Sequence, residues 1–377
     1  MPASWSKRSH CTSSQPLLNP NPSPTVSTPR SNQRSMIIPA ESTDVNQRLV
    51  IALGDPAGIG MEVTLKALAD PRCPVGLEPL LVGCRRTLEQ TYRQLVPNSA
   101  VPLADPASLA INDLPLNEPV HPGRPSAAGG AASFQWLTRA TTLALQGQAR
   151  ALVTAPIAKH IWHAAGHTYP GQTERLAELG GGRQASMLFT ALSPHTGWRL
   201  NTLLATTHIP LAAVPKTLTP ETIHSKLNTL AQFCRRFRQQ PRLHVAGLNP
   251  HAGENGQLGQ EECSWIEAAL EEWSVANPDV VLTGPLPPDT CWLTAAQAWN
   301  EGATNTSPDG FLALYHDQGL IPVKLLAFDQ AVNTTLGLPF LRTSPDHGTG
   351  FDIAGQAIAR PASMVAAIRA AWELSRV

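Results

Sequence analysis

The chain has 377 residues, 42% of them hydrophobic, and its 28 basic and 28 acidic residues cancel to a formal net charge of zero. This length and composition suit a folded protein with a sizeable core, and the charge balance excludes a general electrostatic attraction to nucleic acids or anionic membranes. The six cysteines include no C-x-x-C pair, and no apolar run approaches the roughly 20 residues of a membrane span. We therefore expect a soluble cytoplasmic protein that binds small molecules.

The first 48 residues differ in composition from the rest of the chain. They hold seven prolines and no acidic residue before Glu41, and such a segment cannot bury enough surface to offset the entropy of ordering. We predict a disordered tail over residues 1–48, or a start site assigned too early, with Met36 as the true start. A targeting peptide is the alternative, because Lys7 and Arg8 lie among serines, but the prolines oppose the amphipathic helix of such peptides.

Short apolar runs separated by helix-like stretches follow from Arg48 onward. Most are continuously apolar, as in strands that are buried on both faces of a parallel sheet. The predicted strands are Leu49–Leu53, Ala151–Val153, Thr202–Ala205, Leu243–Ala246, Val280–Leu282 and Phe311–Leu314. One helix is predicted behind the Thr219-Pro220-Glu221 start signal, with apolar residues through Phe237, and another around Trp265–Trp273. This alternation predicts a parallel or mixed α/β fold.

Turn-forming and reactive residues follow the predicted strands. Ligands of open α/β sheets bind outside the carboxyl ends of the strands, so these loops form the candidate site. The first loop, Gly54–Gly60, is neither G-x-G-x-x-G nor a P-loop, so the chain has no classical dinucleotide-binding fingerprint there. The loop is either an anion cradle at the start of a helix or a close-packed turn.

Three of the twelve histidines, His208, His251 and His316, follow three different predicted strands. Imidazole is the commonest ligand of borderline divalent metals, and three protein ligands leave positions open for substrate oxygens. One such histidine alone would be read as a hydrogen-bonded loop residue, but the shared placement favours a catalytic site for zinc, magnesium, manganese or cobalt. Asp289 and Asp317 are candidates for orienting these ligands, for handling protons or for capping turns.

Lys324, Asn333 and Arg342 lie close together in a C-terminal segment with few other cations. Charged donors beside an amide and hydroxyls suit a phosphate or a carboxylate. The alternative is an ordinary surface lysine and an arginine that is paired within the protein.

Several long motifs resemble those of the 4-hydroxythreonine-4-phosphate dehydrogenase family, NAD-dependent enzymes of pyridoxal 5′-phosphate biosynthesis. The resemblance runs in register from about Leu49 to the C-terminus. The motifs that carry it are GDPAGIG at 54–60, VTAPIAK at 153–159, ATTHIPL at 205–211, GLNPHAGE at 247–254, GPLPPDT at 284–290, HDQG at 316–319, NTTLGLPF at 333–340 and RTSPDHG at 342–348.

The resemblance implies a fold like that of isocitrate and isopropylmalate dehydrogenases, with two α/β/α subdomains around a cleft. We expect residues 49–145 and 285–377 to form the first subdomain, and residues 146–284 to form the second and to carry dimer contacts. The family's active site lies at a homodimer interface, so a monomer is expected to lack complete sites.

The resemblance also implies roles for single residues. The implied metal ligands are His208, His251 and His316, and the implied substrate-binding residues are Gln172, Thr173, Lys324, Asn333 and Arg342. One departure concerns Gly171-Gln172-Thr173-Glu174, where the family usually has Gly-His-Thr-Glu; glutamine does not titrate near neutrality as histidine does. Asp317 is our candidate for the proton acceptor.

The implied reaction is an NAD- and divalent-metal-dependent oxidation of 4-phosphohydroxy-L-threonine to a β-keto acid. Loss of CO₂ from that acid gives 3-amino-2-oxopropyl phosphate, and NADP is the alternative cofactor. Two other functions stay open: a paralogous dehydrogenase of another phosphorylated hydroxy acid, such as a four-carbon aldonate phosphate, and a phosphate acyltransferase of related fold.

Overall fold

The computed structural model describes residues 45–182 and 184–376. The predicted tail, with Met36 and the basic residues of the alternative targeting peptide, lies outside the described residues except for its end. There, Val45–Gln47 form a short 3-10 turn and Arg48 begins the first strand. The described residues belong to one compact unit, and none of their helices is long and apolar enough to cross a membrane.

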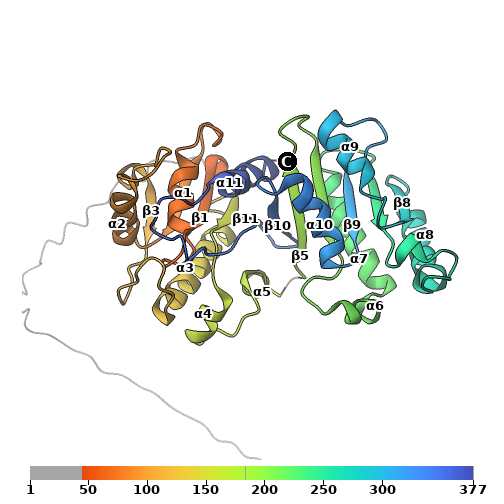
Figure 1. The fold of residues 1–377 in the computed structure, drawn as a ribbon, viewed down its shortest axis with the longest axis horizontal. Coiled ribbons are helices and arrows are strands. Elements are labelled where there is room, and N and C mark those ends of the chain that lie inside the picture. The colour runs from red at the N-terminus through yellow and green to blue at the C-terminus, as the bar shows by residue number, and fades with distance from the viewer. Residues whose placement is uncertain (1–44, 183, 377) are drawn as a thin grey trace, which may run out of the picture. The chain divides into compact units, whose positions relative to one another are not determined.

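An 11-stranded sheet runs through this unit in the order β3-β2-β1-β4-β11-β10-β5-β6-β9-β7-β8 (Figure 1). The strands are β1 Arg48–Ala52, β2 Glu78–Gly83, β3 Ala110–Asp113, β4 Ala151–Thr154, β5 Ser186–Leu192, β6 Arg199–Leu204, β7 Arg242–Ala246, β8 Val281–Leu286, β9 Gly310–Ala313, β10 Val332–Leu336 and β11 Leu341–Pro345.

The sheet joins two parallel groups of strands through antiparallel neighbours. Strands β3, β2, β1, β4 and β11 form one parallel group, and β6, β9, β7 and β8 form the other. The pairs β11–β10, β10–β5 and β5–β6 are antiparallel. These three reversals make the two groups run in opposite directions. The loops that follow the predicted strands therefore divide into two sets, with the glycine loop after β1 in one set and the histidine loops in the other.

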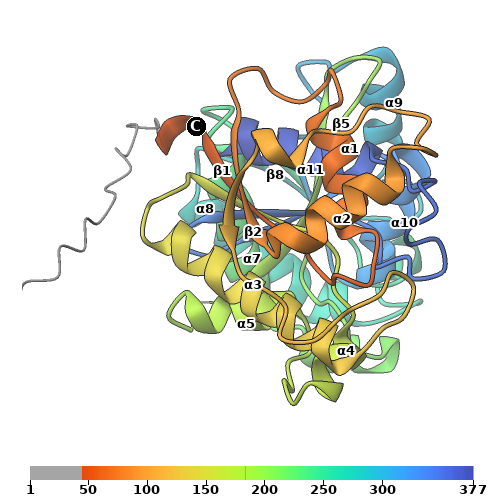
Figure 2. The same ribbon diagram turned by 90° about the vertical axis from the view of Figure 1, so that its left-hand side faces the viewer.

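Helices lie between the strands along the chain and cover the sheet, which confirms the predicted mixed α/β class (Figures 1 and 2). In the first group α3 contacts β1 and β2, whereas α11 contacts β4 and β11; in the second, α7 and α10 contact β6 and β9. The helices are α1 Gly60–Leu68, α2 Arg85–Leu95, α3 Ala127–Leu145, α4 Lys159–Ala164, α5 Gln172–Leu179, α6 Val214–Thr217, α7 Pro220–Cys234, α8 Glu267–Ala276, α9 Leu293–Glu301, α10 His316–Ala327 and α11 Ala362–Leu374.

All six predicted strands are present, with shifted ends, as β1, β4, β6, β7, β8 and β9. The helix start signal is also confirmed, because the Thr219 hydroxyl caps α7 by accepting a hydrogen bond from the Thr222 amide at 3.2 Å. The predicted extension of this helix to Phe237 is wrong: α7 ends at Cys234, and the Phe237 side chain is 48% exposed. Strands β2, β3, β5, β10 and β11 were not predicted.

The expected subdomain boundaries stay a prediction, and the strand pairing bears on them at two points. Strand β4, which falls within 146–284, pairs with β1, and β9, which falls within 285–377, pairs with β6 and β7. If the subdomains were defined by which strands pair, β4 would belong to the first subdomain and β9 to the second.

Candidate active site

A cavity of about 470 Å³ opens on one face of the central strands. The register aligns Arg342 of β11 with Thr335 of β10, and Thr335 with Met187 of β5, so these side chains point to the same face as Asn333. The cavity is lined by Thr154 at the end of β4, Lys159 at the start of α4, Gln172, Thr173 and Glu174 of α5, Met187 of β5, His208 beyond β6, Lys226 of α7, Asn333 of β10, Arg342 of β11 and residues 344–348.

Arg342 is a buried cation, with only 3% of the residue exposed. Its guanidinium donates to the Thr154 hydroxyl at 2.7 and 3.0 Å and to the Thr335 hydroxyl at 3.2 Å. Burial lowers the pKa of Arg342 to about 10, and Glu174 partly opposes that shift. All of these hydrogen-bond partners are neutral, and no carboxylate of the described residues forms an ion pair with the guanidinium. Arg342 is therefore not the internally paired arginine of the alternative interpretation.

Gln172 holds Arg342 in place from the start of α5. Its side-chain oxygen accepts a hydrogen bond from Arg342 at 3.2 Å, and its side-chain nitrogen donates to the Ala155 carbonyl at 3.3 Å. Both ends of the amide are used by the protein. Gln172 therefore bridges Arg342 and the Ala155 carbonyl as a neutral donor and acceptor, a role that needs no titratable group.

Two polar atoms in the cavity lining are buried without a partner among the described residues: the side-chain oxygen of Asn333 and Nε2 of His347. Leaving such groups unsatisfied is costly, so both are candidates to bind a ligand. Lys324 lies nearer solvent on α10, where its ammonium group pairs with Asp346 of the cavity lining at 2.8 Å.

His208 and His316 come together at a smaller hollow of about 220 Å³ beside the cavity, and His208 lines both. Their ring centroids are 5.5 Å apart. Nδ1 of His316 contacts the Asp317 carboxylate at 2.7 Å, which leaves Nε2 of His316 to face a ligand. Partial burial lowers the pKa of His208; Lys159 and His316 act in the same direction, and Glu174 opposes them.

His251 does not join these two rings within the chain. No group of three histidine, cysteine or acidic side chains suited to a metal ion occurs among the described residues. His251 is exposed on the loop after β7, where residues 251–256 all have positive φ. Left-handed backbone costs roughly 1–2 kcal/mol for each residue that is not glycine, so this loop needs support from the rest of the structure.

Glu262 supplies that support from a fully buried position. One of its oxygens accepts hydrogen bonds from the backbone amides of Leu248 and Asn249, at 2.7 and 2.8 Å, and the other accepts from the Asn249 side chain at 2.7 Å. This carboxylate therefore fixes the chain just before the left-handed turn that presents His251.

The glycine loop Gly54–Gly60 is a close-packed turn. Its amides at Asp55, Gly58 and Ile59 donate to carbonyl groups of the protein, and the Ala57 amide donates to the Asp55 carboxylate. A Cβ added at Gly60 would lie 2.4 Å from the Leu53 carbonyl oxygen. These glycines therefore permit close packing, and the structure favours this interpretation over an anion cradle.

Sequence reasoning missed several residues of the cavity, among them Thr154, Lys159, Glu174 and Lys226. The first three fall in or beside motifs that carry the family resemblance. Lys226 had another signal: it follows Ile223 by three residues and precedes Leu230 by four, which places a lysine on the apolar face of α7.

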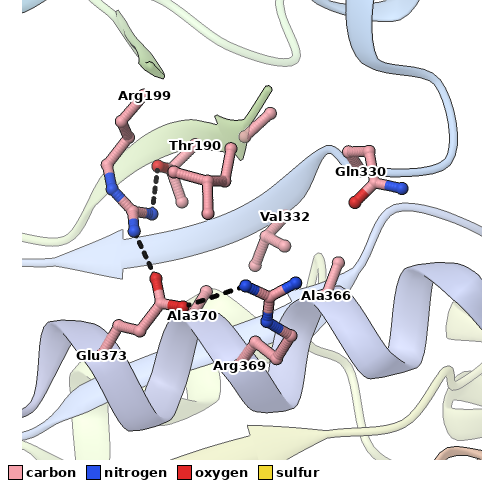
Figure 3. A pocket seen from close by; sticks show the side chains of 10 residues that line it. Thr190, Arg199, Gln330, Val332, Ala366, Arg369, Ala370 and Glu373 are labelled. Carbon is pink, nitrogen blue, oxygen red and sulfur yellow. Dashed lines mark hydrogen bonds and ion pairs between the residues drawn. The ribbon is translucent and has the colours of Figure 1, made fainter. Parts of the chain in front are cut away.

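A shallow crevice between β5, β6, β10 and α11 is not a second site (Figure 3). Its charged side chains already bind one another: Glu373 pairs with Arg199 and with Arg369. Both arginines share this one carboxylate, and the crevice encloses only about 20 Å³, which is too small for an organic ligand.

A model of the family described as pyridoxal phosphate biosynthetic protein PdxA matches residues 76–371. The 4-hydroxythreonine-4-phosphate dehydrogenase of Synechococcus sp. (strain RCC307) is 67% identical over 328 residues, which cover 87% of this chain and 99% of that protein. The D-threonate 4-phosphate dehydrogenase of Pectobacterium atrosepticum is 38% identical, with coverage of 87% and 99%. The crystal structure of 4-hydroxythreonine-4-phosphate dehydrogenase from Klebsiella pneumoniae matches with a TM-score of 0.73 at 36% identity, covering 88% of this chain and 98% of that one. These matches confirm the resemblance and the fold expected from it.

Replacing Glu262 with alanine should destabilise the protein by about 2–4 kcal/mol, because buried amide donors lose their acceptor. The measurement is the free energy of unfolding in urea. Glu267→Ala, on the exposed side of α8, is the control and should change stability by less than about 0.5 kcal/mol. Equal effects of the two substitutions would show that Glu262 does not support the loop.

Proposed function

The chain belongs to the PdxA family of pyridoxal phosphate biosynthetic proteins, and on that basis we propose that it is the NAD-dependent dehydrogenase of 4-phosphohydroxy-L-threonine. The observation that carries the proposal is the buried Arg342 guanidinium, which has only neutral hydrogen-bond partners in a cavity that His208 also lines. A buried cation of this kind suits a phosphorylated substrate.

The substrate would be held by side chains from the central strands and from two helices. Arg342 and Asn333 lie on the central strands, Gln172 and Thr173 begin α5, and Lys324 reaches the rim from α10. Fixing both ends of a small acid in this way holds the alcohol carbon in one place, which lowers the entropic cost of reaction. These substrate-binding roles rest on the geometry of the cavity and on the family motifs.

In the proposed reaction, the secondary alcohol loses a hydride and a proton and becomes 2-amino-3-oxo-4-(phosphooxy)butanoate. Loss of CO₂ then yields 3-amino-2-oxopropyl phosphate. NAD, when bound, takes up the hydride, and NADP is the alternative acceptor. Asp317 stays a prediction as the proton acceptor: its carboxylate contacts His316, so an orienting role for Asp317 agrees with the geometry as well.

The donor set at the rim of the cavity fits a divalent cation. His208 and His316 offer two imidazoles whose centroids are 5.5 Å apart, and Asp317 orients one of them. A cation there, zinc, magnesium, manganese or cobalt, would act as a Lewis acid on the alcohol and keto oxygens. The third ligand would be His251 of a second copy of the chain, because the described residues of one chain contain no group of three ligands.

An exposed apolar stripe on helix α10 is evidence for this proposed homodimer. Ile321, Leu325 and Phe328 are 59%, 81% and 62% exposed, and their spacing places them on one face of the helix that begins at His316. Apolar side chains that cluster in this way on a surface favour a protein partner. We propose that a second copy covers the stripe and brings its His251 loop to the cation.

The other candidate functions are less well supported. The relative named for D-threonate 4-phosphate is 38% identical, against 67% for a relative named for 4-hydroxythreonine 4-phosphate. A phosphate acyltransferase is not favoured, because these relatives are named dehydrogenases. Gln172 remains the reason to compare substrates directly.

Purified protein should form NADH from 4-phosphohydroxy-L-threonine and NAD at a higher kcat/KM than from D-threonate 4-phosphate. The assay follows NADH absorbance after chelation and add-back of each metal, with NADP in a parallel series. A preference for D-threonate 4-phosphate would contradict the proposed substrate, and turnover that is insensitive to chelation would contradict the proposed metal.

His251→Ala should lose both bound metal and turnover while the circular dichroism spectrum of the folded protein stays unchanged, because His251 is exposed. Metal content is measured on dialysed protein by atomic emission. His195→Ala, at another exposed loop position, should keep both properties. Full metal content in the His251 variant would remove this residue from the proposed ligand set.

A further inference from the structure

Lys226 is a buried lysine that takes no part in the proposed reaction or metal site. It lies on α7, on the same helix face as the core residues Ile223 and Leu230, and only 7% of it is exposed. Its ammonium group donates one hydrogen bond, to the Ser186 hydroxyl at the start of β5, at 2.8 Å. An ammonium has three donors, so most of its hydrogen-bonding capacity is not used by the described protein groups.

The charge of Lys226 has no counterpart among the described residues. Burial lowers the pKa of Lys226, and no acidic side chain acts against that shift. The same chain shows what a satisfied buried lysine looks like: Lys66, which is 3% exposed, pairs with Glu62 at 2.8 Å and donates to the carbonyl groups of Ala357 and Ala359. A buried ammonium without such partners is destabilising.

Lys226 lines the same cavity as Arg342. Both cations are buried, and their hydrogen bonds go to neutral groups: the Ser186 hydroxyl for Lys226, and hydroxyls and the Gln172 amide for Arg342. A ligand with more than one negative charge would neutralise these two buried cations, since no carboxylate in the described part of the chain contacts either of them. A phosphate group carries about two charges near neutral pH and has several acceptor oxygens.

We propose that Lys226 is a second cationic anchor for the phosphate group of the ligand, acting together with Arg342. The phosphate supplies the negative charge and the acceptors that the Lys226 ammonium lacks in the free protein. The inference deepens the proposed function and rests on it for the identity of the ligand. It makes Lys226 a determinant of the preference for phosphorylated over unphosphorylated acids.

The test measures the binding of inorganic phosphate to the full chain by calorimetry, with acetate as the singly charged carboxylate. Lys226→Met keeps the length of the side chain and removes its charge, and it should weaken phosphate binding at least roughly tenfold. Lys226→Gln keeps a donor for Ser186 and should give the same loss. Lys216→Met, on the exposed surface of α6, is the matched control and should bind phosphate as the wild type does.

The thermal midpoint without phosphate separates a binding role from a structural one. Removing a buried charge that lacks a partner should leave the midpoint unchanged or raise it, whereas a structural lysine would lower it. Unchanged phosphate affinity in both Lys226 variants, a stronger response to acetate than to phosphate, or no phosphate binding by the wild type would each overturn the proposal.

The two hypotheses fail separately. If the wild type oxidises 4-phosphohydroxy-L-threonine but the Lys226 variants bind phosphate normally, only the role of Lys226 is wrong. If the wild type binds phosphate through Lys226 but forms no NADH from that substrate, the proposed function is wrong and the anion site stands.

Discussion

The reversal of strand direction in the middle of the sheet is the constraint on which the site depends. Three antiparallel pairings join two parallel groups, and the central strands β11, β10 and β5 turn Arg342, Asn333 and Met187 to one face. The end of β4 and the loop after β6 then border the same cavity, although β4 and β6 belong to groups that run in opposite directions. One continuous sheet therefore brings Arg342 and Asn333 to the cavity that His208 also lines.

The cavity contains two buried cations that no carboxylate within residues 45–182 and 184–376 contacts directly. Arg342 and Lys226 are both buried, and hydroxyl and amide groups, which fix direction without neutralising charge, hold them. The chain does neutralise a buried lysine elsewhere, at Lys66 and Glu62. Desolvation of Arg342 and Lys226 is therefore unfavourable in the free protein, and an anion bound in the proposed site would offset it. The His251 loop is also unfavourable by itself, because its residues adopt left-handed backbone conformations. The buried carboxylate of Glu262 holds the chain just before this turn.

The sequence predicted those parts of the fold whose residues follow one simple pattern. Strands such as β1 and β9 are continuously apolar because both faces are buried, and they were found. The missed strands β10 and β11 carry Asn333, Thr335 and Arg342, polar residues that serve the cavity and hide the strand pattern. The motifs identified the candidate ligand-binding residues, but spacing along the chain cannot reveal which histidines meet within one subunit. Lys226 was missed because the apolar residues around it have the spacing of an ordinary amphipathic helix.

The central claim is that each metal site combines His208 and His316 of one chain with His251 of another. It is tested most directly by refolding inactive His208→Ala and His251→Ala chains together in equal amounts and measuring NADH formation. About half of the dimers would be hybrids, and each hybrid would have one intact site, so about a quarter of the wild-type activity should return. If all three ligands came from one chain, neither site of a hybrid would be intact. Activity of the mixture that stays at the level of the separate variants would therefore contradict the account.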